Sequence, residues 1–243
     1  MGTWRTFDTT DDRRPIVEAA LSVGIDLFDS SPMYGRAEAV LSAAVANLRS
    51  RVLVATKVWT PDPREGREQV ARALKLYGHI DVYQVHNLVN VPDHLAHLEE
   101  LKAASLVRAI GVTHYQEMAF PEIAHWMSSG RIDMVQIPYN PLIREAEREL
   151  LPLADSLGLG VFVMSPLGGG ILKRKPSDTD LSRLGVETWA QAVLKWIASD
   201  RRVSSVLTAT HRRQRVAENA KGGEPPFFTT AQRDLVVRIA EGG

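Results

Sequence analysis

The chain has 243 residues, of which 44% are hydrophobic and 24% are charged, and its 29 basic and 29 acidic side chains give a formal net charge of zero. This composition is typical of a globular protein, and the balanced charge excludes a general attraction to nucleic acid or to an anionic membrane. Because cysteine is absent, disulfides, thiolate catalysis and cysteine-ligated metals are excluded as well.

Targeting and metal-binding patterns are also missing from the sequence. No apolar run approaches the roughly 18 residues of a membrane-spanning helix, and residues 1–12 lack the basic and apolar regions of a signal peptide. We therefore expect a cytoplasmic protein. The seven histidines form no H-E-x-x-H pattern and have no supporting carboxylate spacing, so no metal site is predicted.

The first half of the chain alternates short apolar runs with amphipathic stretches. A very short strand is expected at residues 2–4, followed by a helix with Pro15 in its first turn. The periodicity of residues 36–49 predicts an amphipathic helix, and residues 61–66 look like a polar loop. Further helices are expected around Leu74 and Leu98. The predicted strands of this half are residues 25–29, 52–56, 80–85 and 107–112.

The same alternation continues in the second half. Helices are predicted around Ile123, at residues 150–157, 189–197 and 212–220, and after a capping box formed by Thr229 and Gln232. The segment 165–185 holds three consecutive glycines and is expected to be the longest loop, which favours a functional role. The predicted strands are residues 134–137, 160–164 and 203–207.

Strand and helix thus alternate about eight times, and no stretch has the composition of a domain linker. A single (β/α)8 TIM barrel over residues 1–243 is the fold class that this pattern predicts. The alternative is an open, doubly wound sheet, which would call for a glycine-rich turn after the first strand. The sequence has no such turn.

Four reactive side chains follow the ends of three consecutive predicted strands. Asp29 and Tyr34 follow the first of these strands, Lys57 ends the second and His86 ends the third. Since the carboxyl ends of parallel strands meet at one end of a barrel, we expect these side chains to lie together. Taken singly, each also has an ordinary structural explanation, as a turn cap, a surface ring, a solvated strand end or a core histidine.

The segment F-D-S-S-P-M-Y-G at residues 28–35 resembles the motif F-D-T-A-x-x-Y-G of the aldo-keto reductases, and the four side chains resemble that family's Asp, Tyr, Lys, His tetrad. The resemblance implies NADPH-dependent reduction of a small aldehyde or ketone by hydride transfer. Tyr34 would give the proton, Lys57 would lower the pKa of Tyr34, and Asp29 would orient Lys57. His86 would hydrogen-bond the carbonyl oxygen.

The resemblance also implies where a nicotinamide cofactor would bind. The carboxamide and ring would contact Thr113, His114, Gln136 and Met164, where the family has Ser, Asn, Gln and Tyr. Small residues would let backbone amides approach the pyrophosphate. The family's pyrophosphate-binding loop corresponds here to Ser165, Pro166, Leu167 and Gly168. Further cofactor contacts are expected from Thr3, Trp4 and Asp29.

Residues 207–219 resemble the family's adenosine-phosphate segment, and its R-x-x-E-N ending is present. A guanidinium can grip a 2′-phosphate through two hydrogen bonds, which favours NADPH over NADH. At position 209 this chain has alanine, where the family often has lysine. A solvated helix face would equally explain the arginines. The expected contacts are Thr210, His211, Arg212, Arg215, Glu218 and Asn219.

Trp4, Met33 and Trp59 match positions that wall the family's carbonyl pocket, although aromatic side chains are also common in cores. The chain lacks room for the family's amino-terminal hairpin and ends soon after its last predicted helix. We therefore expect a shallow, permissive pocket for small apolar or aromatic carbonyl compounds.

Two other functions stay open at this stage. One is a nicotinamide-bound regulatory subunit with little turnover, like the channel-associated members of the same family. The other is a barrel isomerase or lyase that binds a phosphorylated substrate and no nicotinamide. The oligomeric state is likewise open, and a monomer is compatible with the sequence.

Overall fold

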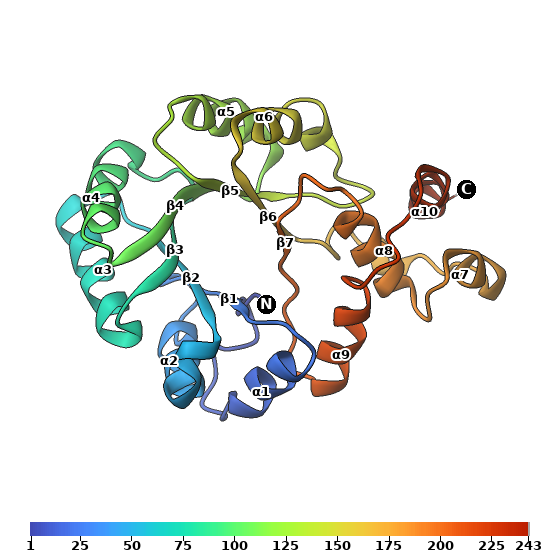
Figure 1. Cartoon of the computed structure of the whole chain (residues 1–243), viewed down its shortest axis with the longest axis horizontal. Coiled ribbons are helices and arrows are strands. Elements are labelled where there is room, and N and C mark those ends of the chain that lie inside the picture. Colours follow the sequence, from blue (N-terminus) through green and yellow to red (C-terminus); the bar gives the residue numbers. More distant parts are fainter. Residues whose placement is uncertain (243) are drawn as a thin grey trace.

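The computed structural model describes residues 1–242, so that Gly243, the last residue of the expected domain, lies outside them. Seven parallel strands follow one another around a curled sheet in the order of the sequence, with helices outside it (Figure 1). The strands are β1 (Leu27–Asp29), β2 (Leu53–Val58), β3 (Ile80–His86), β4 (Val107–Thr113), β5 (Met134–Pro138), β6 (Gly160–Met164) and β7 (Ser205–Val206).

The first three residues join the two ends of this sheet. The Asp29 N–H donates to the Met1 carbonyl (2.9 Å), and the Thr3 N–H donates to the Asp29 carbonyl (2.9 Å). On the other side, the Gly2 N–H donates to the carbonyl of Thr208, just past β7 (2.8 Å). The short strand expected at residues 2–4 is present only as a bridge at Gly2, which completes the ring, and the (β/α)8 barrel is confirmed. The sequential strand order excludes a doubly wound sheet, in which the order reverses.

The helices surround the barrel, and α7 and α10 lie outside this ring against α8 (Figure 1). Proline in the first turn, where its missing N–H has no cost, helps to start α1, α3, α4 and α5. The helices are α1 (Arg14–Ser22), α2 (Ala37–Val45), α3 (Pro63–Tyr77), α4 (Val91–Ala103), α5 (Phe120–Ser128), α6 (Leu150–Leu157), α7 (Asp178–Leu184), α8 (Trp189–Ala198), α9 (Arg213–Lys221) and α10 (Thr230–Glu241).

Three local predictions were wrong. The polar loop expected at 61–66 is mostly the start of α3, because the Asp62 side chain accepts from the Arg64 N–H and caps the helix. The long loop expected at 165–185 contains α7, which begins with a capping box between Ser177 and Asp180. The helix expected at 36–49 changes after Val45 into a 3-10 helix, Ala46–Arg51. By contrast, the capping box of Thr229 and Gln232 is confirmed.

The strands are buried on both faces, as is typical of parallel sheets covered by helices. All five residues of β5 are buried, and so are six of the seven in β3. Most of these side chains are apolar, but several buried ones are polar: Asp29, Thr56, Lys57, Asp81, Gln84, His86, Thr113 and Gln136. Buried polar groups need partners, which directs attention to the carboxyl end of the barrel.

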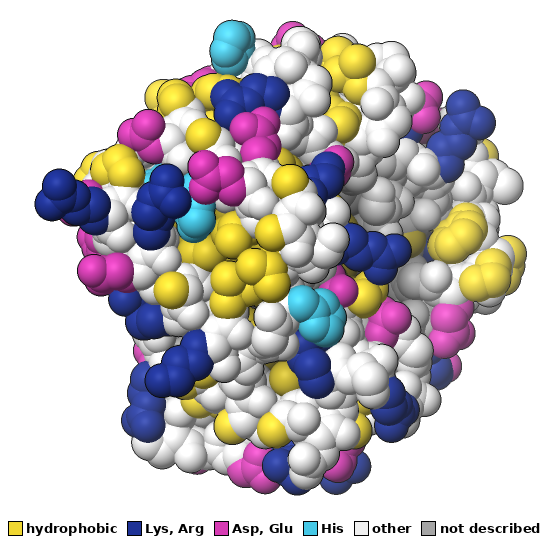
Figure 2. All heavy atoms as spheres, turned by 60° about the vertical axis from the view of Figure 1, so that its left-hand side comes forward, with side chains coloured by type: hydrophobic (Ala, Val, Ile, Leu, Met, Phe, Trp, Pro, Cys, Tyr) yellow, Lys and Arg dark blue, Asp and Glu magenta, His cyan; other side chains and the backbone are white. Residues whose placement is uncertain are grey.

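The surface carries charges of both signs. On the face shown in Figure 2, basic and acidic side chains are interspersed around an apolar patch. This mixture agrees with the zero net charge of the chain. Among the helices of residues 1–242, none combines the length and the apolar character that crossing a membrane would require.

Gly111 of β4 is expected to be indispensable for strand packing. A Cβ atom there would lie 2.2 Å from the carbonyl oxygen of Met134 in β5, and backbone cannot move aside without disturbing the sheet. Gly111→Ala should therefore lower the free energy of unfolding, measured by urea denaturation, by about 1–3 kcal/mol. Gly223→Ala is the control, since its Cβ would meet nothing closer than 3.4 Å. Equal stability of the two variants would contradict this prediction.

Candidate active site

A buried ion pair lies at the carboxyl end of the barrel. The Lys57 Nζ atom in β2 donates to both carboxylate oxygens of Asp29 in β1, each at 2.7 Å, and to the Ser30 carbonyl at 2.8 Å. The side chains are 0% and 4% exposed, respectively. Gln84 of β3 adds a hydrogen bond from its Nε2 atom to Asp29 Oδ1 (3.2 Å). All three donors of the ammonium group are thus used.

Tyr34 and His86 lie beside this pair. The Lys57 Nζ atom is 5.3 Å from the centroid of the Tyr34 ring. The rings of Tyr34 and His86 meet edge to face, with centroids 5.7 Å apart, and Trp4 packs on Tyr34 at 4.9 Å. The structure therefore brings together the four side chains that the strand ends predicted.

Burial and the Lys57 charge set the ionisation of this group. Burial alone would lower the pKa of Lys57, but Asp29 and then Tyr34 raise it above its ordinary value, so the ammonium stays charged. For His86, burial, the Lys57 charge and His114 lower the pKa to about 2. His86 is therefore a neutral imidazole across the physiological range.

The pKa of Tyr34 differs from the expectation. Burial raises it above its ordinary value, and the Lys57 charge, which lowers it, does not fully compensate. The predicted net lowering of the Tyr34 pKa is therefore wrong, although the effect of Lys57 has the expected sign. The phenol keeps its proton at neutral pH and can act as a hydrogen-bond donor.

Asp29, Tyr34 and His86 border a cavity of about 600 Å³, a size that suits a small-molecule ligand, and Lys57 lies buried behind Asp29. The cavity is lined by these expected residues: Trp4, Asp29, Met33, Tyr34, His86, Gln136, Met164, Ser165, Pro166, Leu167 and Gly168. Thr3 lies behind the wall, where its hydroxyl donates to Ser30 Oγ at 2.9 Å.

Gln136, which lines this cavity, has a side-chain acceptor without a partner in the described part of the chain. Its Oε1 atom is buried and has no hydrogen-bond partner within residues 1–242. Thr113, one strand away in register, is fully buried and donates from Oγ1 to the Gln136 carbonyl (2.8 Å). Thr113 thus holds the strand that carries Gln136, and its hydroxyl is not on the cavity wall.

The turn at residues 165–168 is held in a specific conformation. Ser165 has a φ of 52°, in the left-handed region that is uncommon for residues other than glycine. Its carbonyl accepts from the Gly168 N–H (3.0 Å) and from Asn140 Nδ2 (3.0 Å). A side chain on Gly168 would come within 3.1 Å of that carbonyl, so the tight turn favours glycine there.

The residues expected to bind the adenosine phosphate, from Thr210 to Glu218, lie just before α9 and on its first turns. Arg215 forms an ion pair with Glu218 (Nη1 to Oε2, 2.5 Å), and the other carboxylate oxygen of Glu218 is buried without a partner within residues 1–242. Thr210 Oγ1 accepts from the Arg212 N–H (3.1 Å), and His211 is exposed. These groups are not on the wall of the 600 Å³ cavity.

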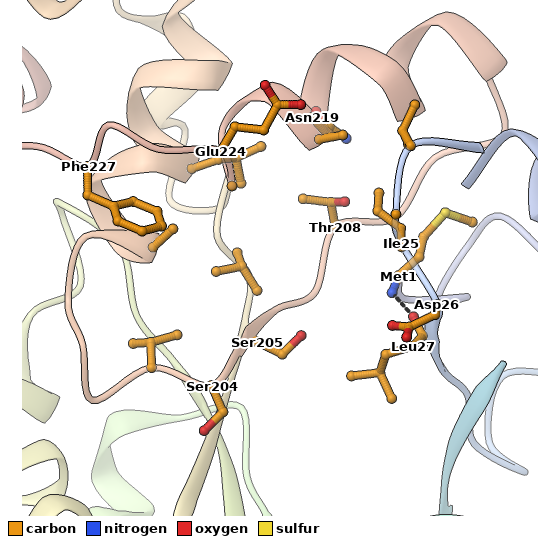
Figure 3. A pocket seen from close by; sticks show the side chains of 18 residues that line it. Met1, Ile25, Asp26, Leu27, Ser204, Ser205, Thr208, Asn219, Glu224 and Phe227 are labelled. Carbon is orange, nitrogen blue, oxygen red and sulfur yellow. Dashed lines mark hydrogen bonds between the residues drawn. The ribbon is translucent and has the colours of Figure 1, made fainter. Parts of the chain in front are cut away.

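Asn219 lines a second cavity, of about 460 Å³, between β1 and β7. Figure 3 shows Asn219 at one end of this space, with Ser204 at the other end and Met1 at the side, its amino group bonded to the Leu27 carbonyl. Thr208 borders both cavities. The second cavity contains none of the four tetrad side chains.

Two expected residues, Trp59 and His114, do not line the cavity. The backbone N–H and carbonyl of Trp59 pair with the Gln69 side chain, and the residue is 41% exposed. His114 is also off the wall, but it stacks on Tyr115, which lines the cavity. Asn87 also lines the cavity, although it was not predicted from the sequence. Its place directly after His86 at a strand end was the available signal.

Comparison with known proteins agrees with this geometry. Residues 1–232 match the model of the aldo/keto reductase family. The chain belongs to the aldo/keto reductase family. Oxidoreductase is therefore its functional class, and the resemblance of residues 28–35 to that family's motif is confirmed.

Individual members of the family differ in what they do. A probable voltage-gated potassium channel subunit beta of Arabidopsis thaliana is 27% identical, over 99% of this chain and 92% of that protein. An NADH-specific methylglyoxal reductase of Escherichia coli is 30% identical, over 71% of this chain and 64% of that protein. An aldo/keto reductase of Klebsiella pneumoniae, solved with NADP and acetate, is 21% identical with a TM-score of 0.84. It matches 99% of this chain and 90% of its own, which supports the fold.

The neutral state of His86 should make this aldo/keto reductase sensitive to acid. Its pKa is about 2 in the folded chain and 6.5 in its ordinary state. Between these values only the unfolded chain binds the proton, so stability is lost as the pH falls below about 6.5. The His86 contribution is a slope of about 1.4 kcal/mol per pH unit.

We expect His86→Gln to lack this slope. Unfolding free energies from urea titrations between about pH 7 and about pH 5 should therefore fall more steeply for the wild type than for the variant. Parallel pH curves for the two proteins would show that His86 already binds a proton in the folded state.

Proposed function

We propose that this chain is an NADPH-dependent carbonyl reductase that converts small aldehydes or ketones into alcohols. The observation that carries the proposal is the arrangement of Tyr34 and His86, two neutral donors, on one cavity wall beside the buried Lys57 ammonium. In carbonyl reduction, negative charge develops on the oxygen, and hydrogen-bond donors fixed in place stabilise it.

The residues divide the chemistry between them. Tyr34 gives its phenolic proton to the oxygen of the substrate, and the Lys57 charge stabilises the phenolate that is left. Asp29 keeps Lys57 charged and in place. His86 donates a hydrogen bond to the same oxygen and orients the carbonyl. Trp4 and Met33, on the cavity wall, favour an apolar or aromatic substituent.

The residues around the cavity fit a nicotinamide cofactor, which would supply the hydride. The partnerless Gln136 Oε1 atom is an acceptor suited to a carboxamide N–H. Met164 offers a polarisable sulfur to a ring, and the turn 165–168 offers closely approachable backbone amides for a pyrophosphate. Arg212 and Arg215, with Thr210 and His211, are the groups that we expect to bind an adenosine 2′-phosphate, because a guanidinium suits a phosphate.

The relatives support the chemistry and leave one alternative. The methylglyoxal reductase of Escherichia coli is an enzyme that is NADH-specific by name, so the choice of NADPH rests on the arginines of this chain. The similarity to a potassium channel subunit beta over 99% of this chain favours, as second candidate, a nicotinamide-bound regulatory subunit. Cofactor binding without turnover of any carbonyl compound would distinguish that function.

Tyr34→Phe tests the proton donor. The ring and its packing against Trp4 stay, and only the hydroxyl is lost, so the variant should bind NADPH as the wild type does. We expect kcat for reduction of a panel of aldehydes and ketones to fall by about 10²- to 10⁴-fold. NADPH consumption and fluorescence titration measure the two quantities. A variant that keeps its kcat would remove Tyr34 from the mechanism.

Arg215→Ala tests the cofactor preference. Loss of a charge-assisted pair to the 2′-phosphate should raise the Kd for NADPH by about 10- to 100-fold and leave the Kd for NADH within about twofold. Arg148→Ala, which removes an exposed guanidinium before α6, should change neither. Equal losses for both cofactors would assign Arg215 to the helix surface instead.

A further inference from the structure

Ser31 makes a contact that the family motif does not provide for. It stands where the motif F-D-T-A-x-x-Y-G has alanine, a side chain without hydrogen-bonding groups. The Ser31 Oγ atom lies 2.8 Å from Nδ1 of His86. Ser31 is fully buried and His86 is only 6% exposed, so water does not compete for this bond.

The surroundings of Ser31 fix the direction of this hydrogen bond. The Met33 N–H donates to Ser31 Oγ (3.3 Å), so the oxygen already accepts one hydrogen bond. If Nδ1 of His86 carried the proton, the hydroxyl hydrogen of Ser31 would have no acceptor within residues 1–242. With the proton on Nε2, the Ser31 hydroxyl donates to Nδ1, and both groups of this contact are paired, as buried polar groups generally are.

We propose that Ser31 is a positioning residue that holds His86 in the tautomer with its proton on Nε2. Nδ1 is then occupied by Ser31, and Nε2, which makes no hydrogen bond within residues 1–242, is the ring donor left for the cavity that His86 lines. The opposite tautomer would present a lone pair there. Because the ring is neutral, its tautomer alone decides whether it donates or accepts.

The catalytic consequence rests on the proposed function. A carbonyl oxygen that gains negative charge is stabilised by an N–H and repelled by a lone pair. In Ser31→Ala, Nδ1 loses its partner, and the two tautomers become closer in free energy. A fraction of the molecules would then present the wrong nitrogen, which lowers kcat without changing the contacts of the cofactor.

Nitrogen NMR of the ¹⁵N-histidine-labelled full-length chain measures the tautomer directly, without turnover. The signal of His86 is identified by its loss in His86→Gln. We expect the proton on Nε2 in the wild type and in Ser31→Thr, which keeps the hydroxyl, and a mixture in Ser31→Ala. Ser30→Ala is the matched control, because it removes an equally buried hydroxyl that contacts Thr3 rather than His86. Its His86 should keep the tautomer of the wild type.

The kinetic arm uses the same variants. Ser31→Ala should lower kcat by about tenfold, by analogy with loss of a group that orients a metal-bound histidine. The Kd for NADPH should stay unchanged, and Ser31→Thr should recover the activity. A wild-type His86 with its proton on Nδ1 would overturn the proposal. So would an unchanged tautomer, or an unchanged kcat, in Ser31→Ala. If the wild type reduces no carbonyl, the proposed function fails, and the NMR result still decides whether Ser31 sets the tautomer.

Discussion

The ion pair of Lys57 and Asp29 is the interaction on which the site depends. Two full charges lie inside a barrel whose neighbouring strand residues are mostly apolar, and both side chains are almost completely buried. Such a pair seldom increases stability over an apolar replacement, because removing two charges from water costs about as much as their attraction returns. Losing one partner alone is far more harmful, typically by about 3–5 kcal/mol. Its presence at the carboxyl end of the strands is therefore better explained by what the charge does there.

The same ammonium acts on two neighbours in different ways. At His86 its charge and burial work in the same direction, since both disfavour imidazolium. At Tyr34 they oppose each other, because burial disfavours the phenolate while Lys57 favours it. Both side chains are consequently neutral donors at neutral pH. In the proposed reaction Tyr34 still gives its proton to the substrate, because the charge that stabilises the phenolate is already in place and needs no reorganisation.

The tetrad was predictable because it depends on a property that local sequence carries. An apolar run that stops at a polar residue marks the end of a strand, and parallel strands bring their ends together whatever the loops do. Asp29, Lys57 and His86 all follow this rule. Trp59 does not, because it lies beyond the end of β2, where its backbone is held by Gln69, ten residues further along the chain.

Other features depended on contacts that periodicity does not reveal. The start of α3 is highly charged, so its apolar period is weak, and only Asp62 and Pro63 indicate where the helix begins. β7 has only two residues, because its remaining partner is the three-residue segment at the start of the chain rather than a full strand. The net direction of the Tyr34 pKa required the depth of burial, which a list of neighbouring charges does not contain.

Closure of the barrel and placement of Tyr34, the proposed proton donor, are two effects of one segment. Gly2 bonds to Thr208 and so joins the ends of the sheet, while the next hydroxyl, on Thr3, bonds to Ser30 beside the ion pair. Trp4 then packs on the ring of Tyr34 and forms part of the cavity wall. A displacement of this segment would thus open the barrel and release Tyr34 together. Rigid strands position side chains more accurately than loops do, so the contact with Trp4, next to a segment bonded to the sheet, restricts Tyr34, which lies on a loop.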